Sequence, residues 1–242
     1  MADWLVPEWP APDNVRSLQT LRSGGCSPAP WISLNLGDHV GDEPSRVAAN
    51  RAVLRASLPG EPLWLQQVHG IAVLDAGSPG TLREADASFA REPGRVCAVM
   101  TADCLPVLFC DRAGTVVAAA HAGWRGLLAG VLSATMHRMA VPPGELMAWL
   151  GPAIGAQAFE VGDEVRAAFV ARDKLAAEAF SPHGKGKWLA DIYQLARQRL
   201  QAAGVSSICG GEWCTVNDAE RFFSYRRDGV TGRMASLIWL ES

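Results

Sequence analysis

Two neighbouring apolar runs with polar residues at fixed places in them constrain the fold of this chain more than any other feature. The polar pair Asp103 and Cys104 stands inside the otherwise apolar stretch 101–111, and the next apolar run, 116–120, leads directly to His121. Short apolar runs bounded by turn residues are typical of buried strands. Because an unpartnered polar group is costly to bury, we expect these three polar residues to have partners or a function.

Strands and helices are predicted along most of the chain from apolar periodicity and turn residues. The predicted strands are 31–36, 63–68, 71–74, 96–100, 105–110, 115–120, 146–150, 206–209 and 234–240, and the predicted helices are 44–58, 124–139, 161–174 and 189–203. We find neither an internal repeat nor a linker-like shift in composition. The pattern predicts an irregular N-terminal segment, 1–30, followed by one mixed α/β domain, 31–242, with helices on sheet faces.

Composition excludes several classes of protein. With 49% hydrophobic and 19% charged residues, the 242-residue chain is expected to fold around a sizeable core. A net charge of −3 and the absence of a basic or aromatic-basic stripe argue against nucleic-acid binding. The first residues do not resemble a signal peptide, and no apolar run approaches the roughly 20 residues of a membrane span. We therefore predict a cytoplasmic protein with no membrane partner, whose six cysteines are reduced.

His69, Cys104 and His121 are the candidate centre. They are 35 and 17 residues apart, so no short zinc-binding spacing is present, but each is placed where a predicted strand ends. Two imidazoles and a thiolate form a set that zinc accepts, with a fourth position left for water or substrate. Bound zinc would lower the pKa of that water. The spacing alone also fits two unrelated core histidines and a buried cysteine.

Two other chemistries use the same three residues. Cys104 is a possible nucleophile activated by His121 or His69, as in a metal-free cysteine hydrolase. Two histidines and a cysteine also suit a single copper ion. A multicopper oxidase with a trinuclear cluster needs more imidazoles than the chain holds, since its five histidines are residues 39, 69, 121, 137 and 183.

Residues next to the candidate centre add to it. The helix predicted to start at Trp124 follows His121 closely, and its free N–H groups and dipole favour an anion nearby. Asp103 alternates away from Cys104 if both are on a strand. It is a candidate for orienting a histidine or for acid–base catalysis, and it could equally cap a turn.

Further candidates are spread along the chain. The stretches 221–228 and 231–233 combine arginines, aromatics and hydroxyls, which suits phosphate binding or base stacking as well as a solvated turn. The residues considered for substrate contact are Asn35, Arg51, Ser224, Arg226 and Arg227, and Glu160 is a second candidate for acid–base catalysis.

Seven blocks of the sequence resemble the signatures of one family in the same order. They are 33–42 (SLNLGDHVGD), 67–70 (QVHG), 101–108 (TADCLPVL), 121–126 (HAGWRG), 151–155 (GPAIG), 160–162 (EVG) and 223–228 (FSYRRD). The family is known as purine nucleoside phosphorylase, polyphenol oxidase (laccase-domain) or peptidoglycan editing factor. The resemblance covers roughly residues 20 to 240 and includes all three candidate ligands.

This resemblance implies a sandwich of mixed sheets flanked by helices and a zinc ion held by His69, Cys104 and His121, with copper as the alternative metal. It implies phosphorolysis of adenosine, inosine and methylthioadenosine with phosphate, and deamination of adenosine, so that the protein would be both a transferase and a hydrolase. Other members are credited with copper-dependent phenol oxidation, or with removing a wrong amino acid from a UDP-muramyl precursor. The family blocks assign no general acid or base.

Overall fold

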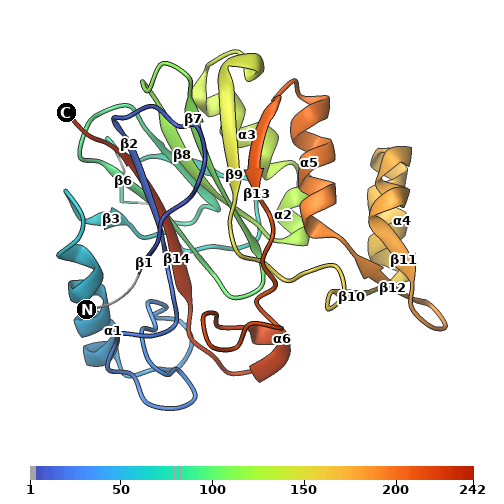
Figure 1. Ribbon diagram of the computed structural model, residues 1–242, viewed down its shortest axis with the longest axis horizontal. Helices are drawn as coiled ribbons and strands as arrows, with labels where there is room; N and C mark the ends of the chain where they lie inside the picture. Colours follow the sequence, from blue (N-terminus) through green and yellow to red (C-terminus); the bar gives the residue numbers. More distant parts are fainter. Residues whose placement is uncertain (1–3, 79, 82) are drawn as a thin grey trace.

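The protein is a layered sandwich in which two β-sheets pack face to face between helices (Figure 1). The computed structural model describes residues 4–78, 80–81 and 83–242, so the first three residues of the segment predicted to be irregular lie outside the description. A smaller lobe projects from the side of the sandwich.

The five-stranded sheet forms one layer. Its order is β1-β2-β14-β6-β3, with bounds Trp4–Leu5, Val15–Thr20, Met234–Leu240, Val96–Thr101 and Pro62–Leu63. The strand pairs are antiparallel except for β3 and β6. The C-terminal strand β14 lies at the centre of this sheet, between β2 and β6.

The six-stranded sheet forms the second layer. Its order is β13-β9-β7-β8-β5-β4, with bounds Ser207–Gly210, Leu146–Leu150, Leu105–Asp111, Val117–Ala122, Ala87–Ala90 and Val73–Asp75. The four central strands pair antiparallel, and the two edge strands pair parallel to their neighbours. Mixed sheets of this kind agree with the predicted fold class.

Helices cover both outer faces of the sandwich. Helix α1 (Pro44–Arg55) packs on the five-stranded sheet, and α2 (Trp124–Ala129), α3 (Val131–Met139) and α5 (Ile192–Ala202) lie against the six-stranded one. The short helix α6 (Tyr225–Asp228) and the 3₁₀ turn η1 (Pro143–Glu145) lie in connections.

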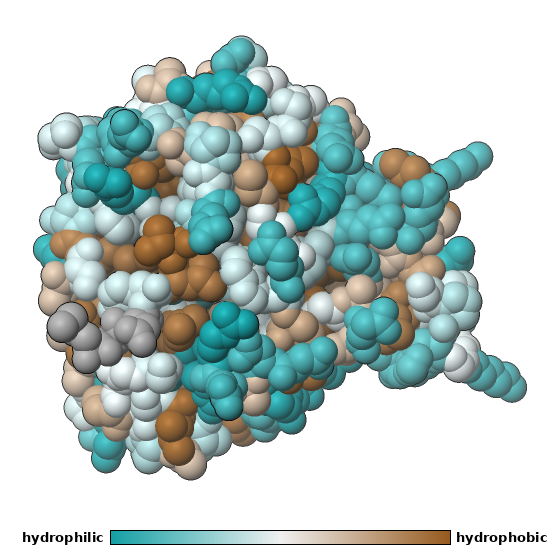
Figure 2. Space-filling view, viewed as in Figure 1, coloured by the Kyte–Doolittle hydropathy of each residue, from teal (hydrophilic) through white to brown (hydrophobic). Residues whose placement is uncertain are grey.

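The projecting lobe consists of α4 (Asp163–Arg172), η2 (Lys174–Ala179) and a three-stranded sheet. The order of that sheet is β10-β12-β11, with bounds Glu160–Gly162, Lys187–Ala190 and Phe180–Pro182. Hydrophilic residues cover most of the lobe on the face shown in Figure 2. Strand β10 joins the lobe to the rest of the chain close to the pocket described below.

The alternation of side chains explains why the central strands are apolar throughout. Along β7, Val107 and Phe109 face the helices, whereas Leu108 and Cys110 face the other sheet. Successive side chains of a strand point to opposite faces, so a strand buried on both faces needs apolar residues at every position. This satisfies the prediction of buried strands at 96–100, 105–110, 115–120, 146–150 and 234–240.

The N-terminal segment differs from the prediction. Residues 1–30 were expected to be irregular with little strand, but β2 pairs with β14 from Val15 to Gln19. The sequence of β2, VRSLQT, is largely polar, yet its Gln19 and Thr20 are fully buried and hydrogen-bonded to β14, through Ser236 and Ala235. A buried strand held by polar side chains does not produce an apolar signal.

The strand predicted at 31–36 is wrong, and the alternation that suggested it has another cause. Leu34 and Leu36 are fully buried, but the chain forms a loop. Its backbone groups bond to other loops and side chains. Asn50 donates to the carbonyls of Ser33 and Asn35, and Leu36 N–H donates to the carbonyl of Arg233.

Other boundaries changed as well. The helices expected at 161–174 and 189–203 start later, at Asp163 and Ile192, because residues 160–162 and 187–190 form the strands β10 and β12. The strand expected at 63–68 is shortened to β3, and the strand at 71–74 shifts to β4. The helix expected at 124–139 is two helices, because Gly130 adopts φ 108, a conformation that ends α2 and starts α3. In the described part of the chain, no helix is long and apolar enough to cross a membrane.

Candidate active site

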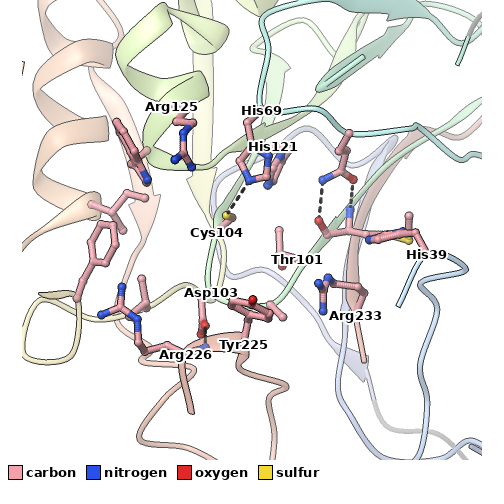
Figure 3. A pocket seen from close by; sticks show the side chains of 17 residues that line it. His39, His69, Thr101, Asp103, Cys104, His121, Arg125, Tyr225, Arg226 and Arg233 are labelled. Atoms are coloured by element: carbon pink, nitrogen blue, oxygen red, sulfur yellow. Dashed lines mark hydrogen bonds between the residues drawn. The ribbon is translucent and has the colours of Figure 1, made fainter. Parts of the chain in front are cut away.

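The three predicted ligands converge at one end of the six-stranded sheet (Figure 3). His69 lies in the loop before β4, Cys104 in the turn between β6 and β7, and His121 in β8. One ligand atom from each of the three lies within 4.8 Å of the others. Cys104 Sγ is 3.8 Å from His69 Nε2, and the two imidazole rings meet edge to face with centroids 4.8 Å apart.

Strand pairing brings Cys104 and His121 together. Leu105 of β7 is paired with Ala122 of β8, and Pro106 with His121, so Cys104 and His121 lie diagonally across the Leu105–Ala122 pair. Diagonal neighbours on antiparallel strands are within reach of long side chains. Asp103 and Cys104 were expected on a strand and instead form a turn, in which Asp103 has φ 89. His121 is inside β8 rather than after it, two residues before α2 starts.

Glycine is required where α2 approaches the two ligands. A Cβ atom at Gly123 would lie 2.8 Å from His69 Cδ2 and 3.0 Å from Cys104 Sγ. Such distances are too short for a side chain, so only glycine lets the start of the helix pack against both ligands.

Asp86 was missed by the sequence analysis, although it is central to the site. It is fully buried and lies directly before β5. Its Oδ1 accepts a hydrogen bond from His121 Nδ1 at 2.8 Å, and its two oxygens also accept from the N–H groups of residues 68, 69 and 70. Burial alone would raise the pKa of this carboxyl, but the bonds from His121 and Gly70 outweigh burial and hold the pKa below its usual value.

The cysteine and the buried histidine shift each other's protonation. Burial favours the neutral thiol, yet the charge and hydrogen bonds of His121, helped by His69, lower the pKa of Cys104 to about 6. Burial likewise disfavours charged His121, but the Cys104 thiolate and Asp86 raise its pKa to about 9. Without a metal, the pair is therefore a thiolate and an imidazolium near neutral pH.

The cluster lies in a pocket of about 510 Å³, within the size range of small-molecule sites. The residues that line it are His39, Gln67, His69, Met100, Thr101, Ala102, Asp103, Cys104, His121, Trp124, Arg125, Ile154, Phe159, Ile192, Tyr225, Arg226 and Arg233. Three of them are arginines and three are large aromatics. Among the described residues of this lining, Asp103 is the single carboxylate.

Asp103 connects the Cys104 turn to α6. Its two carboxylate oxygens accept from the Thr215 hydroxyl and from Arg226 N–H, and its backbone carbonyl accepts from Ile154 N–H. This arrangement places Tyr225 and Arg226 at the pocket, as Figure 3 shows. Arg226 also donates to the Glu160 carbonyl and lies over the Phe159 ring.

The other predicted contact residues do not line the pocket. Arg227 donates to the carbonyls of Thr215, Val216 and Phe222. Ser224 caps α6 by accepting from Arg227 N–H.

Asn35, Arg51 and Glu160 also lie outside the lining. Asn35 is fully buried and bonds to Gly37 and Asp42, which organises the 33–42 loop. Arg51 stacks on Trp64 and pairs with Asp38, whereas the Glu160 carboxylate faces His183 and Lys187.

Some lining residues stand in the motifs quoted above but were not singled out. Gln67 is next but one to His69, and its amide makes two hydrogen bonds to the backbone of Met100, at 2.7 and 2.8 Å. His39, Thr101, Arg125 and Tyr225 likewise lie within the quoted blocks, so the blocks were a signal for them. Arg233 lies outside every block, but it belongs to the stretch 231–233 that was considered for phosphate binding.

The donor set fits a transition metal. His121 uses Nδ1 for Asp86, which leaves Nε2 for a metal, and the lowered pKa of Cys104 supplies a thiolate. Three such donors with an open side toward a pocket are typical of catalytic rather than structural metal sites. In the part of the chain that the structure describes, this is the one group of three His, Cys, Asp or Glu residues close enough to hold an ion.

Fold and pocket together define a mixed α/β protein with a His-Cys-His group that can bind a metal. The chain belongs to the family described as multi-copper polyphenol oxidoreductase laccase, whose model matches residues 16–241. This confirms the resemblance found in the sequence.

Similar proteins span the whole chain. A purine nucleoside phosphorylase of Pseudomonas aeruginosa is 57% identical over 100% of both chains, and the purine nucleoside phosphorylase YfiH of Escherichia coli is 59% identical over 99% of this chain and 100% of its own. A crystal structure of a Neisseria meningitidis protein has 55% identity and a TM-score of 0.95, and covers 99% of each chain.

Proposed function

We propose that this protein is a zinc-dependent purine nucleoside phosphorylase acting on adenosine, inosine and methylthioadenosine, with adenosine deaminase activity. The observation that carries the proposal is the convergence of His69, Cys104 and His121 in a basic and aromatic pocket. The names of relatives at 57% and 59% identity support the substrate class. As a nucleoside enzyme, it would work in the cytoplasm on small molecules.

The ligands of the metal would be Nε2 of His69, Sγ of Cys104 and Nε2 of His121. A zinc ion held there would supply a Lewis acid for an oxygen of water or phosphate. In the metal-free protein both ring nitrogens of His121 carry protons near neutral pH. A metal at Nε2 would displace that proton, and Asp86 would keep the other on Nδ1, so that the Nε2 lone pair faces the ion.

Arginines of the lining suit the phosphate. Arg125, Arg226 and Arg233 line the pocket. One guanidinium group can donate two parallel hydrogen bonds to two phosphate oxygens. Arg125 and Arg226 come from the start of α2 and from α6, so a phosphate between them would lie beside the cluster, in the view of Figure 3. Of the arginines considered from the sequence, Arg226 is the one we propose to touch substrate directly.

Aromatic side chains of the lining suit the purine. Trp124, Phe159 and Tyr225 offer faces for stacking, and Tyr225 is 62% exposed beside the pocket mouth. Asp103 lines the pocket whereas the Glu160 carboxylate does not, so Asp103 is the proposed group for proton transfer. Its two hydrogen bonds, from Thr215 and Arg226, would hold it in place for that role.

The test combines metal analysis with turnover. Purified protein should contain about one zinc per chain and should cleave inosine and adenosine only in the presence of phosphate, with ammonia released from adenosine. Chelation and His69→Ala should abolish both reactions. His137→Ala, which changes an exposed histidine of α3, should leave them unchanged. The proposal fails if the protein lacks zinc, and turnover survives both chelation and His69→Ala.

Two observations favour other chemistries of the same residues. The description of the family model points to a copper-dependent phenol oxidase, which would show thiolate-to-copper absorption and consume oxygen with a phenol. The 3.8 Å contact of Cys104 with His69 and the low pKa of the thiol fit a metal-free cysteine hydrolase. That enzyme would be inactivated by a thiol alkylator and indifferent to chelators.

A further inference from the structure

A single buried carboxylate contacts both histidine-bearing segments of the site. Asp86 Oδ1 accepts from His121 Nδ1 at 2.8 Å and from His69 N–H at 2.9 Å. Asp86 Oδ2 accepts from the N–H groups of Val68 at 3.2 Å and Gly70 at 2.6 Å. All four acceptor positions are used, and the backbone carbonyl of Asp86 accepts from His121 N–H in addition.

These bonds hold a backbone that would not persist alone. His69 has φ 60, in the left-handed region that residues other than glycine rarely adopt. Three successive N–H groups around one carboxylate form a concave turn that fixes this conformation. Without the carboxylate, three N–H groups would lose their partner and His69 could relax toward an ordinary conformation.

We propose that Asp86 is a positioning residue that prepares the metal site before a metal arrives, by fixing the His121 ring and the His69 turn together. The inference rests on the metal centre of the proposed function. One side chain would then control two ligands from separate segments, His69 from a loop and His121 from β8. Removing it should therefore disturb both, rather than one.

Asp86→Asn tests this with a minimal change of shape. All four groups facing the carboxylate are nitrogen donors. An asparagine has one acceptor oxygen, so its NH2 group must face either the N–H groups of Val68 and Gly70 or those of His69 and His121. In the first orientation the NH2 group faces the N–H groups of Val68 and Gly70, and these donors repel one another. In the second, His121 must accept at Nδ1 and carry its proton on Nε2, which removes the ligand lone pair.

Asp111→Asn is the matched control. Asp111 is also a buried aspartate that accepts two loop N–H groups, from Thr115 and Val116, but it lies at the other end of β7. Its remaining partner is the Thr115 hydroxyl, which can turn and accept from an asparagine NH2. The control therefore has the same change of charge, in the same sheet, without contact to a ligand.

The experiment measures the zinc affinity of wild type, Asp86→Asn and Asp111→Asn by competition with a chromophoric chelator. We expect Asp86→Asn to bind zinc about 10–100-fold more weakly, as is usual when a partner behind a metal-bound histidine is lost. Asp111→Asn should match wild type. The visible spectrum with Co²⁺ should change in Asp86→Asn alone, because both imidazoles move.

The outcomes separate the inference from the proposed function. If wild type binds no zinc, the proposed function fails and takes the inference with it. If wild type binds zinc and Asp86→Asn binds it equally well with the same Co²⁺ spectrum, only the inference fails. An affinity lost equally in Asp111→Asn would also overturn it, since the effect would then be general.

A second measurement does not require the variant to fold. In zinc-loaded wild-type protein, ¹⁵N NMR should show the proton of His121 on Nδ1, shifted downfield by its hydrogen bond to Asp86. A His121 Nδ1 without a proton would overturn the proposal.

Discussion

The two ends of the β7–β8 pair solve the same structural problem with different consequences. At one end, Asp86 binds the backbone of the His69 turn, and at the other, Asp111 binds the turn that joins β7 to β8. Both aspartates are buried, and the ends lie roughly 20 Å apart at about 3.3 Å per residue. They differ in their last partner, which is the His121 ring at one end and the Thr115 hydroxyl at the other.

The two buried carboxylates differ in whether they also contact a side chain of the candidate active site. Holding loop N–H groups with a carboxylate is ordinary structural chemistry and occurs at both ends. Only at the Asp86 end does the carboxylate also orient an imidazole beside a thiolate, at a pocket. The candidate site therefore differs from the Asp111 end by one contact, from Asp86 to the His121 ring. The binding of loop N–H groups by a buried carboxylate is common to both ends.

The largest expected difference between the ends comes from removing a ligand. His121→Ala deletes one of three donors, so zinc affinity should fall by more than the roughly 10–100-fold typical of residues behind the ligands. Nucleoside phosphorolysis should fall to background with it. Isothermal titration with zinc and the turnover assay measure both, with His137→Ala as control. Near-normal zinc binding in His121→Ala would contradict the ligand assignment.

The second-largest effect is expected from a substitution at Gly123, where the start of α2 packs against two of the ligands. In Gly123→Ala the new methyl group would meet His69 Cδ2 at 2.8 Å and Cys104 Sγ at 3.0 Å. Both ligands must shift, and we expect zinc affinity to drop about tenfold or more, as for other changes behind the ligands. Gly144→Ala is the control, because a Cβ there meets nothing within 4 Å. Equal affinities of the two variants would show that α2 tolerates displacement.

A smaller effect is expected in the labelling of Cys104. Because the pKa of Cys104 is lowered to about 6, the rate at which the metal-free protein reacts with iodoacetamide should have its midpoint near that pH. The rate should then level off instead of rising through pH 9. At pH 7 the rate should exceed that of an ordinary thiol several-fold, since a higher thiolate fraction outweighs lower nucleophilicity. Peptide mapping separates Cys104 from other cysteines, and zinc should protect it. A midpoint near pH 9 would contradict the thiolate–imidazolium pair.

The sequence predicted those strands and ligands that can be recognised from residue type alone. Apolar runs predicted β7, β8 and β9 because these strands are buried on both faces. His69, Cys104 and His121 were selected because each lies where an apolar run is interrupted or ends. Their convergence, by contrast, depends on which strand pairs with which, and the family resemblance supplied that expectation.

The sequence concealed the residues whose importance comes from long-range contacts. Asp86 stands in the polar stretch READAS, where nothing distinguishes it from Glu84, and its role depends on pairing across the sheet with His121. Arg226 and Arg227 are neighbours of the same type, yet one faces the pocket and the other binds carbonyl groups. Only the position of α6 separates them.

The smallest effect is expected at the opposite end of the β7–β8 pair, where Asp111 lies. In Asp111→Asn, one amide oxygen can keep both N–H bonds, and the NH2 group can donate to the Thr115 hydroxyl, which reverses its role. What is lost is the charge of the acceptor, so the free energy of unfolding should fall by only about 0.5–1.5 kcal/mol. Urea denaturation of the metal-free proteins measures it. Asp86→Asn faces four nitrogen donors and cannot compensate in this way, so its loss should be clearly larger. Equal losses would mean that the identity of the partners does not matter, and that the two ends differ only in location.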